Sequence, residues 1–126
     1  FDQSTIQNLH LPASIEKFGK LWCYGTPNLI NITISQNSKN FRIHNQSMLL
    51  GKMKTLINID ESKLSSENYD VLYFASRNIE NIIIPSTIKR ISSCCFENCK
   101  RLKNIEISND SELEIIEKIC IFKINT

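Results

Sequence analysis

Residues 79–108 read IENIIIPSTIKRISSCCFENCKRLKNIEIS and contain one short pattern twice. The pattern is an apolar residue, any residue, an asparagine and a second apolar residue. It starts at residues 6, 29, 56, 79 and 102, so successive copies lie 23, 27, 23 and 23 residues apart. Internal periods of roughly 20 to 50 residues are typical of repeat proteins, in which each unit packs against its neighbours.

Each copy predicts a short strand with one buried face. In four copies a further apolar residue follows two positions after the tetrad, and the third copy has Glu61 there instead. Alternation with a period of two is typical of a half-buried strand, and a period near 23 falls in the leucine-rich range. The four apolar residues are Leu11, Ile34, Ile84 and Ile107.

A second set of apolar positions predicts another extended segment, followed by a tight turn, in each coil. These positions are Ile15, Phe18 and Cys23, then Ile88, Ile91 and Phe96, then Leu113, Ile116 and Ile121. Coils stacked at the strand spacing share a continuous core. The fold class is therefore a mainly β repeat solenoid, in one domain of residues 1–126, with repeats near 6–28, 29–55, 56–78, 79–101 and 102–126.

The tetrad asparagines are predicted to form a structural column, because identical amides in register can hydrogen-bond along the stack. They are Asn8, Asn31, Asn58, Asn81 and Asn104.

An insertion of about residues 37–78 interrupts the repeats. Phe41 and Ile43 alternate, Met48 to Leu50 form a second apolar run, and Asn45-Gln46 make a turn between them, which predicts a hairpin. Asp60 to Asp70 is acidic and predicts an exposed loop, and Val71 then starts a new extended segment that runs to Phe74.

Residues 79–122 resemble the BspA-like leucine-rich repeats of bacterial surface proteins and protist parasites, whose pattern is similar to L-x-x-I-x-I-P-x-S-I-x-x-I-G-x-x-A-F-x-x-C. The stretch NSKNFRIHNQSMLLGKMKTLINI resembles the hairpin insertion of those arrays. The departures stay small or apolar: Cys95 and Cys120 replace a small residue, Cys23 and Ile121 replace Phe, and Ser92 replaces Gly.

The resemblance implies a surface antigen or adhesin that binds a host or matrix protein by surface complementarity. The alternative is an intracellular structural or scaffold protein that docks on a larger assembly such as the cytoskeleton. Five free thiols and an absence of sugar at Asn45 would favour the alternative.

The net charge and the lengths of the apolar runs indicate which classes of partner are expected. The formal net charge of +2 gives little attraction toward phosphate backbones, so we expect a protein partner and no nucleic acid. No apolar run approaches the roughly 20 residues that span a bilayer, so we expect no direct membrane insertion in this segment. The chain starts at Phe1 without a signal peptide and begins and ends inside repeats. We therefore expect a fragment of a longer array, with its compartment open between cell surface and cytoplasm.

Neither a metal site, a cofactor site nor a catalytic site is expected. Cys94, Cys95 and Cys99 are close in sequence, but neither His10 nor His44 lies near them. Buried thiols are the simpler interpretation, with Cys94 pointing outward and a Cys95–Cys120 disulfide left open. The sequence contains no phosphate loop, H-E-x-x-H or G-x-S-x-G motif.

The candidate partner-binding residues are those that point outward between the apolar positions of each strand, because solenoids commonly bind through such a row. They are His10, Thr33, Ile83 and Glu106. Of the sequons at Asn31, Asn45 and Asn109, Asn45 in the hairpin turn is the glycosylation candidate. A basic fourth coil followed by an acidic fifth coil predicts a solvated, self-complementary face.

Overall fold

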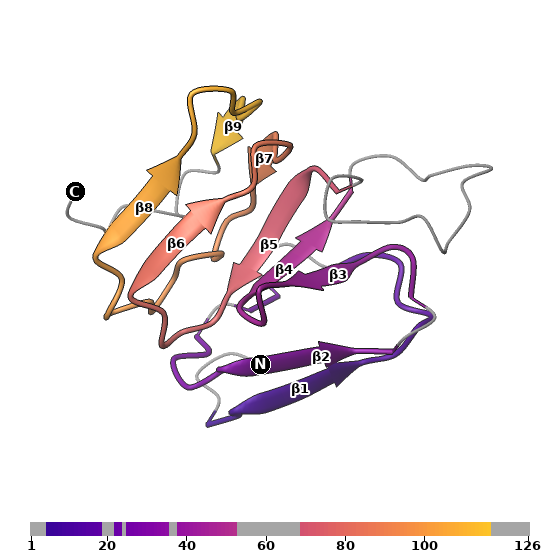
Figure 1. The fold of residues 1–126 in the computed structure, drawn as a ribbon. Helices are drawn as coiled ribbons and strands as arrows, with labels where there is room; N and C mark the ends of the chain where they lie inside the picture. The colour runs from indigo at the N-terminus through magenta and orange to yellow at the C-terminus, as the bar shows by residue number, and fades with distance from the viewer. Residues whose placement is uncertain (1–4, 19–21, 24, 36–37, 53–68, 117–126) are drawn as a thin grey trace.

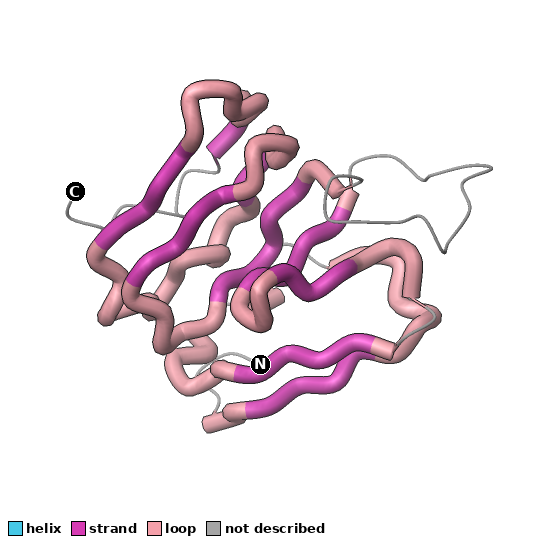
Figure 2. Tube along the Cα trace, viewed as in Figure 1, coloured by secondary structure: helices cyan, strands magenta, loops and turns pink. Residues whose placement is uncertain are grey.

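Short strands joined by turns and loops make up the computed structural model, which describes residues 5–18, 22–23, 25–35, 38–52 and 69–116 (Figures 1 and 2). No helix occurs in these residues. The strands are β1 (Asn8–Leu11), β2 (Asn31–Ile34), β3 (Arg42–His44), β4 (Met48–Gly51), β5 (Val71–Ala75), β6 (Asn81–Ile84), β7 (Arg90–Ile91), β8 (Asn104–Ile107) and β9 (Ile115–Ile116).

Three sheets result, which we call sheets A, B and C. Sheet A is the pair β1-β2, sheet C is the pair β6-β8, and sheet B has the order β3-β4-β5-β7-β9. Both two-stranded sheets are parallel, and they pair equivalent tetrad positions, Asn8 with Asn31 and Asn81 with Asn104. The predicted solenoid with a period near 23 residues is thus confirmed, whereas the third tetrad, 56–59, lies outside the described residues.

The predicted hairpin is present. β3 and β4 pair antiparallel, and the turn between them places Asn45 at φ 51° and Gln46 at φ 60°. Two consecutive left-handed residues match the right-handed twist of the flanking strands. β4 then pairs antiparallel with β5, which confirms the extended segment that was expected from Val71 onward.

The second extended segment of each coil is also present. β5, β7 and β9 run parallel in sheet B, so this sheet carries the back strands of the coils as well as the hairpin. The expected exposed loop of residues 60–70 lies mostly outside the described residues. At its end the expectation is wrong, because Tyr69 is buried and its hydroxyl donates a hydrogen bond to the Lys39 carbonyl at 2.9 Å.

The core lies between sheet B and the two smaller sheets. Sheet C covers one cluster, in which Ile82 and Ile84 pack with Leu50, Leu72 and other residues of sheet B. Sheet A covers a second cluster, whose members include Leu11, Ile32, Leu49 and Phe74. β4 contributes to both clusters, and all four of its residues are buried. The hairpin is therefore part of the interior and does not merely decorate it.

Arg77, at the end of β5, links the two halves of the core. It is 3% exposed, and its guanidinium lies over the Phe74 ring at 4.6 Å. It donates to the carbonyls of Cys95 at 2.8 Å, Cys23 at 3.0 Å and Thr26 at 3.2 Å. Its planar fork of donors satisfies carbonyls that lie far apart in the sequence. No sequence pattern indicated this role.

The predicted buried positions are mostly correct, and the exceptions have physical reasons. Ile88, Ile91, Phe96 and Cys23 are buried. Ile107 is 47% and Ile116 is 42% exposed, contrary to their predicted inward placement. Each belongs to β8 or β9, the last strand of its sheet in the described part of the chain, so a neighbouring strand covers it on one side only. Leu113 is partly buried, and Ile121 lies outside the described residues.

Cys94 corrects another expectation, because its side chain points inward and is 1% exposed. It adopts φ 69° in the turn that follows β7. A left-handed residue breaks the alternation of side-chain directions that holds along a strand, so counting positions from β7 assigns the wrong side.

Candidate protein-binding surface

The four predicted partner-binding residues all lie exposed on the outer faces of sheets A and C, in two pairs. His10 and Thr33 are register partners, and the imidazole Nδ1 is hydrogen-bonded to the Thr33 hydroxyl at 2.8 Å. The other ring nitrogen of His10 lies 3.3 Å from the Ser35 hydroxyl. These contacts tie both ring nitrogens of His10 to side chains at β2.

Ile83 and Glu106 are the second pair, in register across β6 and β8. Ile83 is 60% exposed, the largest exposure among the exposed apolar side chains of the described residues. The two pairs lie on separate sheets, with the hairpin between them (Figure 1). The structure thus splits the predicted row into two short surfaces.

The asparagine column has the structural role that was predicted for it. The Asn31 amide donates to the Asn8 side-chain oxygen at 2.7 Å, and the Asn104 amide donates to that of Asn81 at 2.7 Å. We call the strands of sheets A and C, which are β1, β2, β6 and β8, the front strands. The two ladders lie at the start of these strands and fix their register. Asn58 lies outside the described residues.

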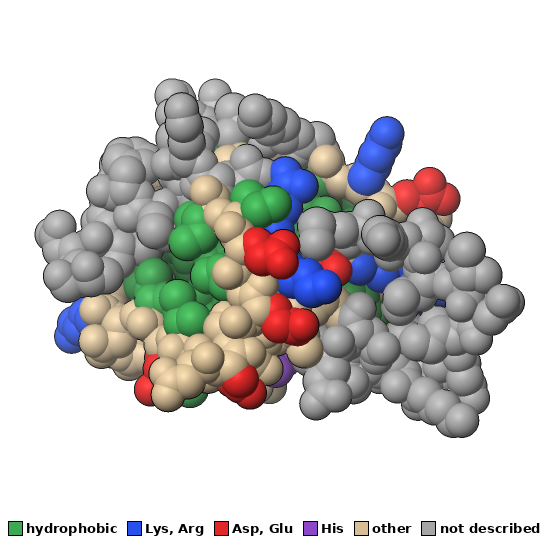
Figure 3. Space-filling view, turned by 90° about the horizontal axis from the view of Figure 1, so that it is seen from above, with side chains coloured by type: hydrophobic (Ala, Val, Ile, Leu, Met, Phe, Trp, Pro, Cys, Tyr) green, Lys and Arg blue, Asp and Glu red, His purple; other side chains and the backbone are tan. Residues whose placement is uncertain are grey.

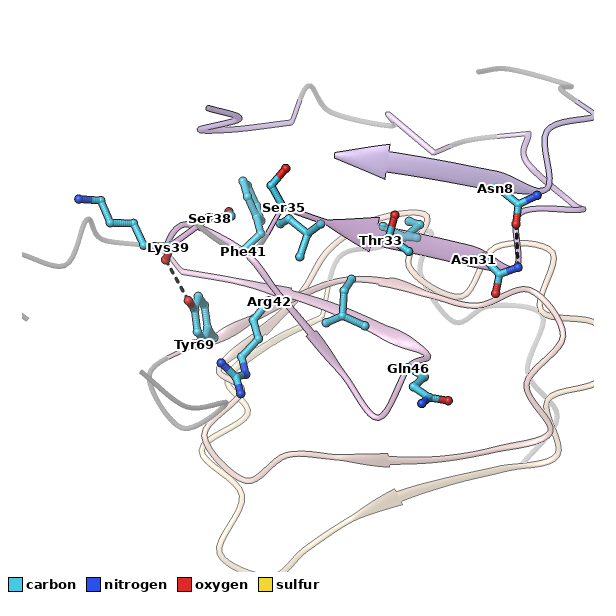
Figure 4. Close-up of a pocket in the computed structure, with 13 residues that line it drawn as sticks. Asn8, Asn31, Thr33, Ser35, Ser38, Lys39, Phe41, Arg42, Gln46 and Tyr69 are labelled. Atoms are coloured by element: carbon cyan, nitrogen blue, oxygen red, sulfur yellow. Dashed lines mark hydrogen bonds between the residues drawn. The ribbon is translucent and has the colours of Figure 1, made fainter. Parts of the chain in front are cut away.

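A groove lies where sheet A faces the hairpin. It is a cavity of about 800 Å³, lined by residues of β2, of β3 and of the chain between them, together with Asn8, Gln46 and Tyr69 (Figure 4). Of the four predicted binding residues, only Thr33 lines it. Ligand sites typically enclose about 300 to 1,000 Å³, so the groove is large enough for a peptide segment.

One end of the groove is basic. Lys39 and Arg42 line it there, on either side of Tyr69 (Figure 4). The ammonium of Lys52 lies 5.8 Å from the centre of the Tyr69 ring. Burial lowers the pKa of Lys52, and the charge of Lys39 lowers it further. Burial raises the pKa of Tyr69, while the charge of Arg42 acts in the opposite direction. Lys39 and Arg42 therefore make this end of the groove basic, and we call these two residues the basic end.

This groove was not predicted from the sequence. Its basic residues come from the hairpin insertion, and Tyr69 comes from the segment that precedes β5. No sequence motif contains both the basic residues and Tyr69, because these residues come together only in the folded structure, beside the gap between β2 and β3. The one available signal was the hairpin prediction itself, which placed an extra element beside the second repeat.

Cys23, Cys94, Cys95 and Cys99 are buried and form no disulfide bonds with one another. Burial raises the pKa of Cys23 to about 12, against the opposing charge of Arg77. The Cys23 thiol donates to the Cys94 carbonyl at 3.6 Å. Within the described ranges, no group of three or more His, Cys, Asp or Glu side chains could hold a metal ion. The open question of a Cys95–Cys120 disulfide lies outside them, since Cys120 is not described.

The sequon residues differ in accessibility. Asn45 and Asn109 are exposed, Asn45 at the tip of the hairpin. The Asn31 amide nitrogen, to which a glycan would be attached, donates to Asn8 in the ladder, so a glycan there would crowd that bond. Asn45 remains the glycosylation candidate.

The face above β8 and β9 combines apolar and charged side chains. Hydrophobic side chains gather there beside a mixed group of acidic and basic ones (Figure 3). Ile107, Ile115 and Ile116 are the exposed apolar residues of these two strands. The described part of the chain contains no helix that is long and apolar enough to cross a membrane.

Comparison with solved structures supports the solenoid. A leucine-rich repeat protein from Eubacterium ventriosum superimposes with a TM-score of 0.68 at 22% identity, over 89% of this chain and 26% of that protein. The pneumococcal vaccine antigen PcpA superimposes with a TM-score of 0.68 at 19% identity, over 96% of this chain and 27% of that protein. The chain thus spans about a quarter of either structure, and at these identities the likeness shows the fold.

No curated protein matches the sequence. The sequence does match the BspA type leucine rich repeat region over residues 1–62 and 67–126, in six copies, where the tetrads indicated five. The match covers nearly the whole chain and agrees with the parallel pairing of equivalent asparagines. The chain belongs to the BspA-type leucine-rich repeat family.

Proposed function

We propose that this chain is a protein-binding module of a surface protein, which holds its partner through the outward side chains of the front strands. The observation that carries the proposal is the exposure of Ile83, at 60%, on a sheet whose register is fixed by the Asn81–Asn104 ladder. An apolar side chain held rigidly on an outer face gains free energy when a partner covers it. The likeness to a pneumococcal vaccine antigen supports a surface location.

Binding in this proposal uses shape and side-chain complementarity, with no cofactor and no reaction. Glu106 lies beside Ile83 in register, so a partner that covers the isoleucine also meets a carboxylate. His10 and Thr33 offer a polar surface on sheet A. A host or matrix protein is the expected partner class.

Surface plasmon resonance with the intact protein tests the proposal. We expect binding to at least one member of a panel of extracellular-matrix proteins, and at least a tenfold weaker affinity for Ile83→Arg and for Glu106→Lys. Glu112→Lys is the matched control, because Glu112 is exposed, carries the same charge and lies outside the front strands. Equal affinities for Glu106→Lys and Glu112→Lys would contradict the proposed surface.

A second candidate is an intracellular scaffold that docks on the cytoskeleton, and the four buried cysteines that form no disulfide bonds with one another favour it. Co-sedimentation with polymerised actin and with microtubules tests it directly. Thiol counting and glycan analysis at Asn45 of the natively expressed protein separate the two candidates. A sugar on Asn45 would exclude the intracellular one, because N-glycans are typical of secreted proteins.

A further inference from the structure

One edge of β2 is open. The backbone N–H groups of Asn31 and Ser35 donate to carbonyls of the β1 side, those of Gln7 at 3.1 Å and Leu11 at 3.1 Å. Successive backbone groups of an extended strand point to alternate sides. The N–H and C=O groups of Ile32 and Ile34 therefore point away from β1, and sheet A ends at β2 in the described residues.

The groove borders this open edge. Ile32 and Ile34 line it from β2, and Arg42 and Ile43 line it from β3, which is itself the end strand of sheet B. Two edge strands therefore face each other across about 800 Å³ (Figure 4). An unpaired edge is a template for a further strand, and peptides are often bound by adding one.

The lining specifies which peptide fits. Ile34, Phe41 and Ile43 offer apolar surface along the groove, whereas Lys39 and Arg42 make its end basic. Among the described residues that line the groove, none is acidic. The Ser38 hydroxyl, also in the lining, is buried without a hydrogen-bond partner among the described residues. It can accept or donate one bond to an incoming polar group after rotation of its side chain.

We infer that the groove binds an extended segment of a partner protein, which adds a strand to the open edge of β2 and places an acidic side chain against Lys39 and Arg42. The inference rests on the proposed function and names a binding site and a partner chemistry for it. Main-chain hydrogen bonds to Ile32 and Ile34 provide affinity, and the basic end selects peptides that carry a carboxylate at the matching position.

A phage-displayed library of random octapeptides, selected on the intact protein, is the probe. We expect the enriched peptides to alternate apolar and polar residues and to carry Asp or Glu near one end. The double variant K39E/R42E should bind them at least tenfold more weakly, while K100E/R101E keeps wild-type affinity. The control pair is a matched one, since Lys100 and Arg101 are exposed and do not line the groove. Unchanged thermal unfolding of both variants checks that they fold.

An N-methyl scan of the best peptide tests the strand addition itself. Methylation should weaken binding only at alternate residues, because only those N–H groups face β2. In the complex, the Ile34 amide should gain protection from hydrogen exchange. The inference would be overturned if no peptide were enriched, or if the enriched peptides lacked an acidic residue. It would also be overturned if K39E/R42E bound the peptides as tightly as the wild type, or if the N-methyl scan showed no alternation.

The outcome is separable from that of the proposed function. Ile83→Arg lies on sheet C and should leave peptide affinity unchanged while it weakens binding of the matrix protein. If Ile83→Arg lost matrix binding but no peptide were enriched, only the inference about the groove would be rejected. If peptides bound with the predicted pattern but Ile83→Arg did not change matrix binding, only the proposed binding surface of the front strands would be rejected.

Discussion

Arg77 illustrates how one side chain replaces regular backbone pairing at the junction of the core. Its three carbonyl partners belong to the turn before β2 and the turn after β7, where the chain does not continue a sheet. A buried carbonyl without a donor costs about 1 to 3 kcal/mol. The guanidinium stabilises the fold mainly by removing that cost at several groups together.

Arg77→Met should therefore lower the free energy of unfolding by about 3 kcal/mol or more, since it leaves these carbonyls unpaired in a dry interior. Urea denaturation followed by circular dichroism measures the change. Arg101→Met, at an exposed position, is the control and should stay within about 0.5 kcal/mol of the wild type. A similarly small effect at Arg77 would mean that water replaces its hydrogen bonds.

Cys23 couples stability to alkaline pH. Its pKa is raised by burial from 9.0 to about 12, so the unfolded chain releases the thiol proton more readily than the folded chain. This contribution to stability is complete below pH 9 and is lost as the pH rises toward 12. Cys23→Ala should show a shallower decrease of unfolding free energy over this window. Parallel curves for the two proteins above pH 9 would refute the assignment, whatever their offset at neutral pH.

At the scale of elements, the hairpin packs against β5 through close contact at Gly51. A Cβ atom added there would overlap the Tyr73 ring and lie 3.0 Å from the Phe41 ring. These rings belong to a group of aromatic contacts, with centroids 5.6 Å apart. The small residue at the end of β4 is what allows this packing.

Gly51→Ala should destabilise the protein by about 1 to 3 kcal/mol, because the two rings must shift out of their packed positions. Thermal and urea unfolding measure the effect. In a double-mutant cycle with Tyr73→Ala, which removes the nearer ring, the added methyl group should cost less than in the wild type. Additive effects of the two substitutions would argue against direct contact between them.

The elements were largely predictable from the sequence, whereas their lateral arrangement was not. Period-two alternation predicted β2 and β6, and the Asn45-Gln46 dipeptide predicted the turn between β3 and β4. Both signals are local. The groove, by contrast, depends on how far β2 lies from β3, which is set by packing between residues distant in the chain. The inward direction of Cys94 depends on a single left-handed residue that no pattern marks.

At the scale of the whole molecule, the described residues form one continuous sheet that supports two short ones. Sheet B has five strands, and its central strands β4 and β5 have neighbours on both sides. Sheets A and C have two strands each, so every front strand has one unpaired edge in the described part of the chain. Stability in solenoids comes from contact between neighbouring coils, so it should be greatest where sheet B is fully paired.

Native-state hydrogen exchange should reveal this gradient. We expect the slowest exchange at Leu50 and Leu72, which are completely buried in the centre of sheet B, and the fastest strand exchange in β9. In β2 the Thr33 amide should exchange more slowly than the Ile34 amide, because only the former faces β1. Uniform protection across the three sheets would show instead that the molecule opens only as a single cooperative unit.

The division between the two asparagine ladders also affects how such a protein can vary in length. Among the described residues, the Asn8–Asn31 ladder joins β1 to β2, and the Asn81–Asn104 ladder joins β6 to β8. Because the walls of the groove are β2 and the hairpin, a coil duplicated beside β1 or β8 would lengthen one outer sheet without altering those walls. Duplication of coils can therefore extend the array in either direction without changing the groove.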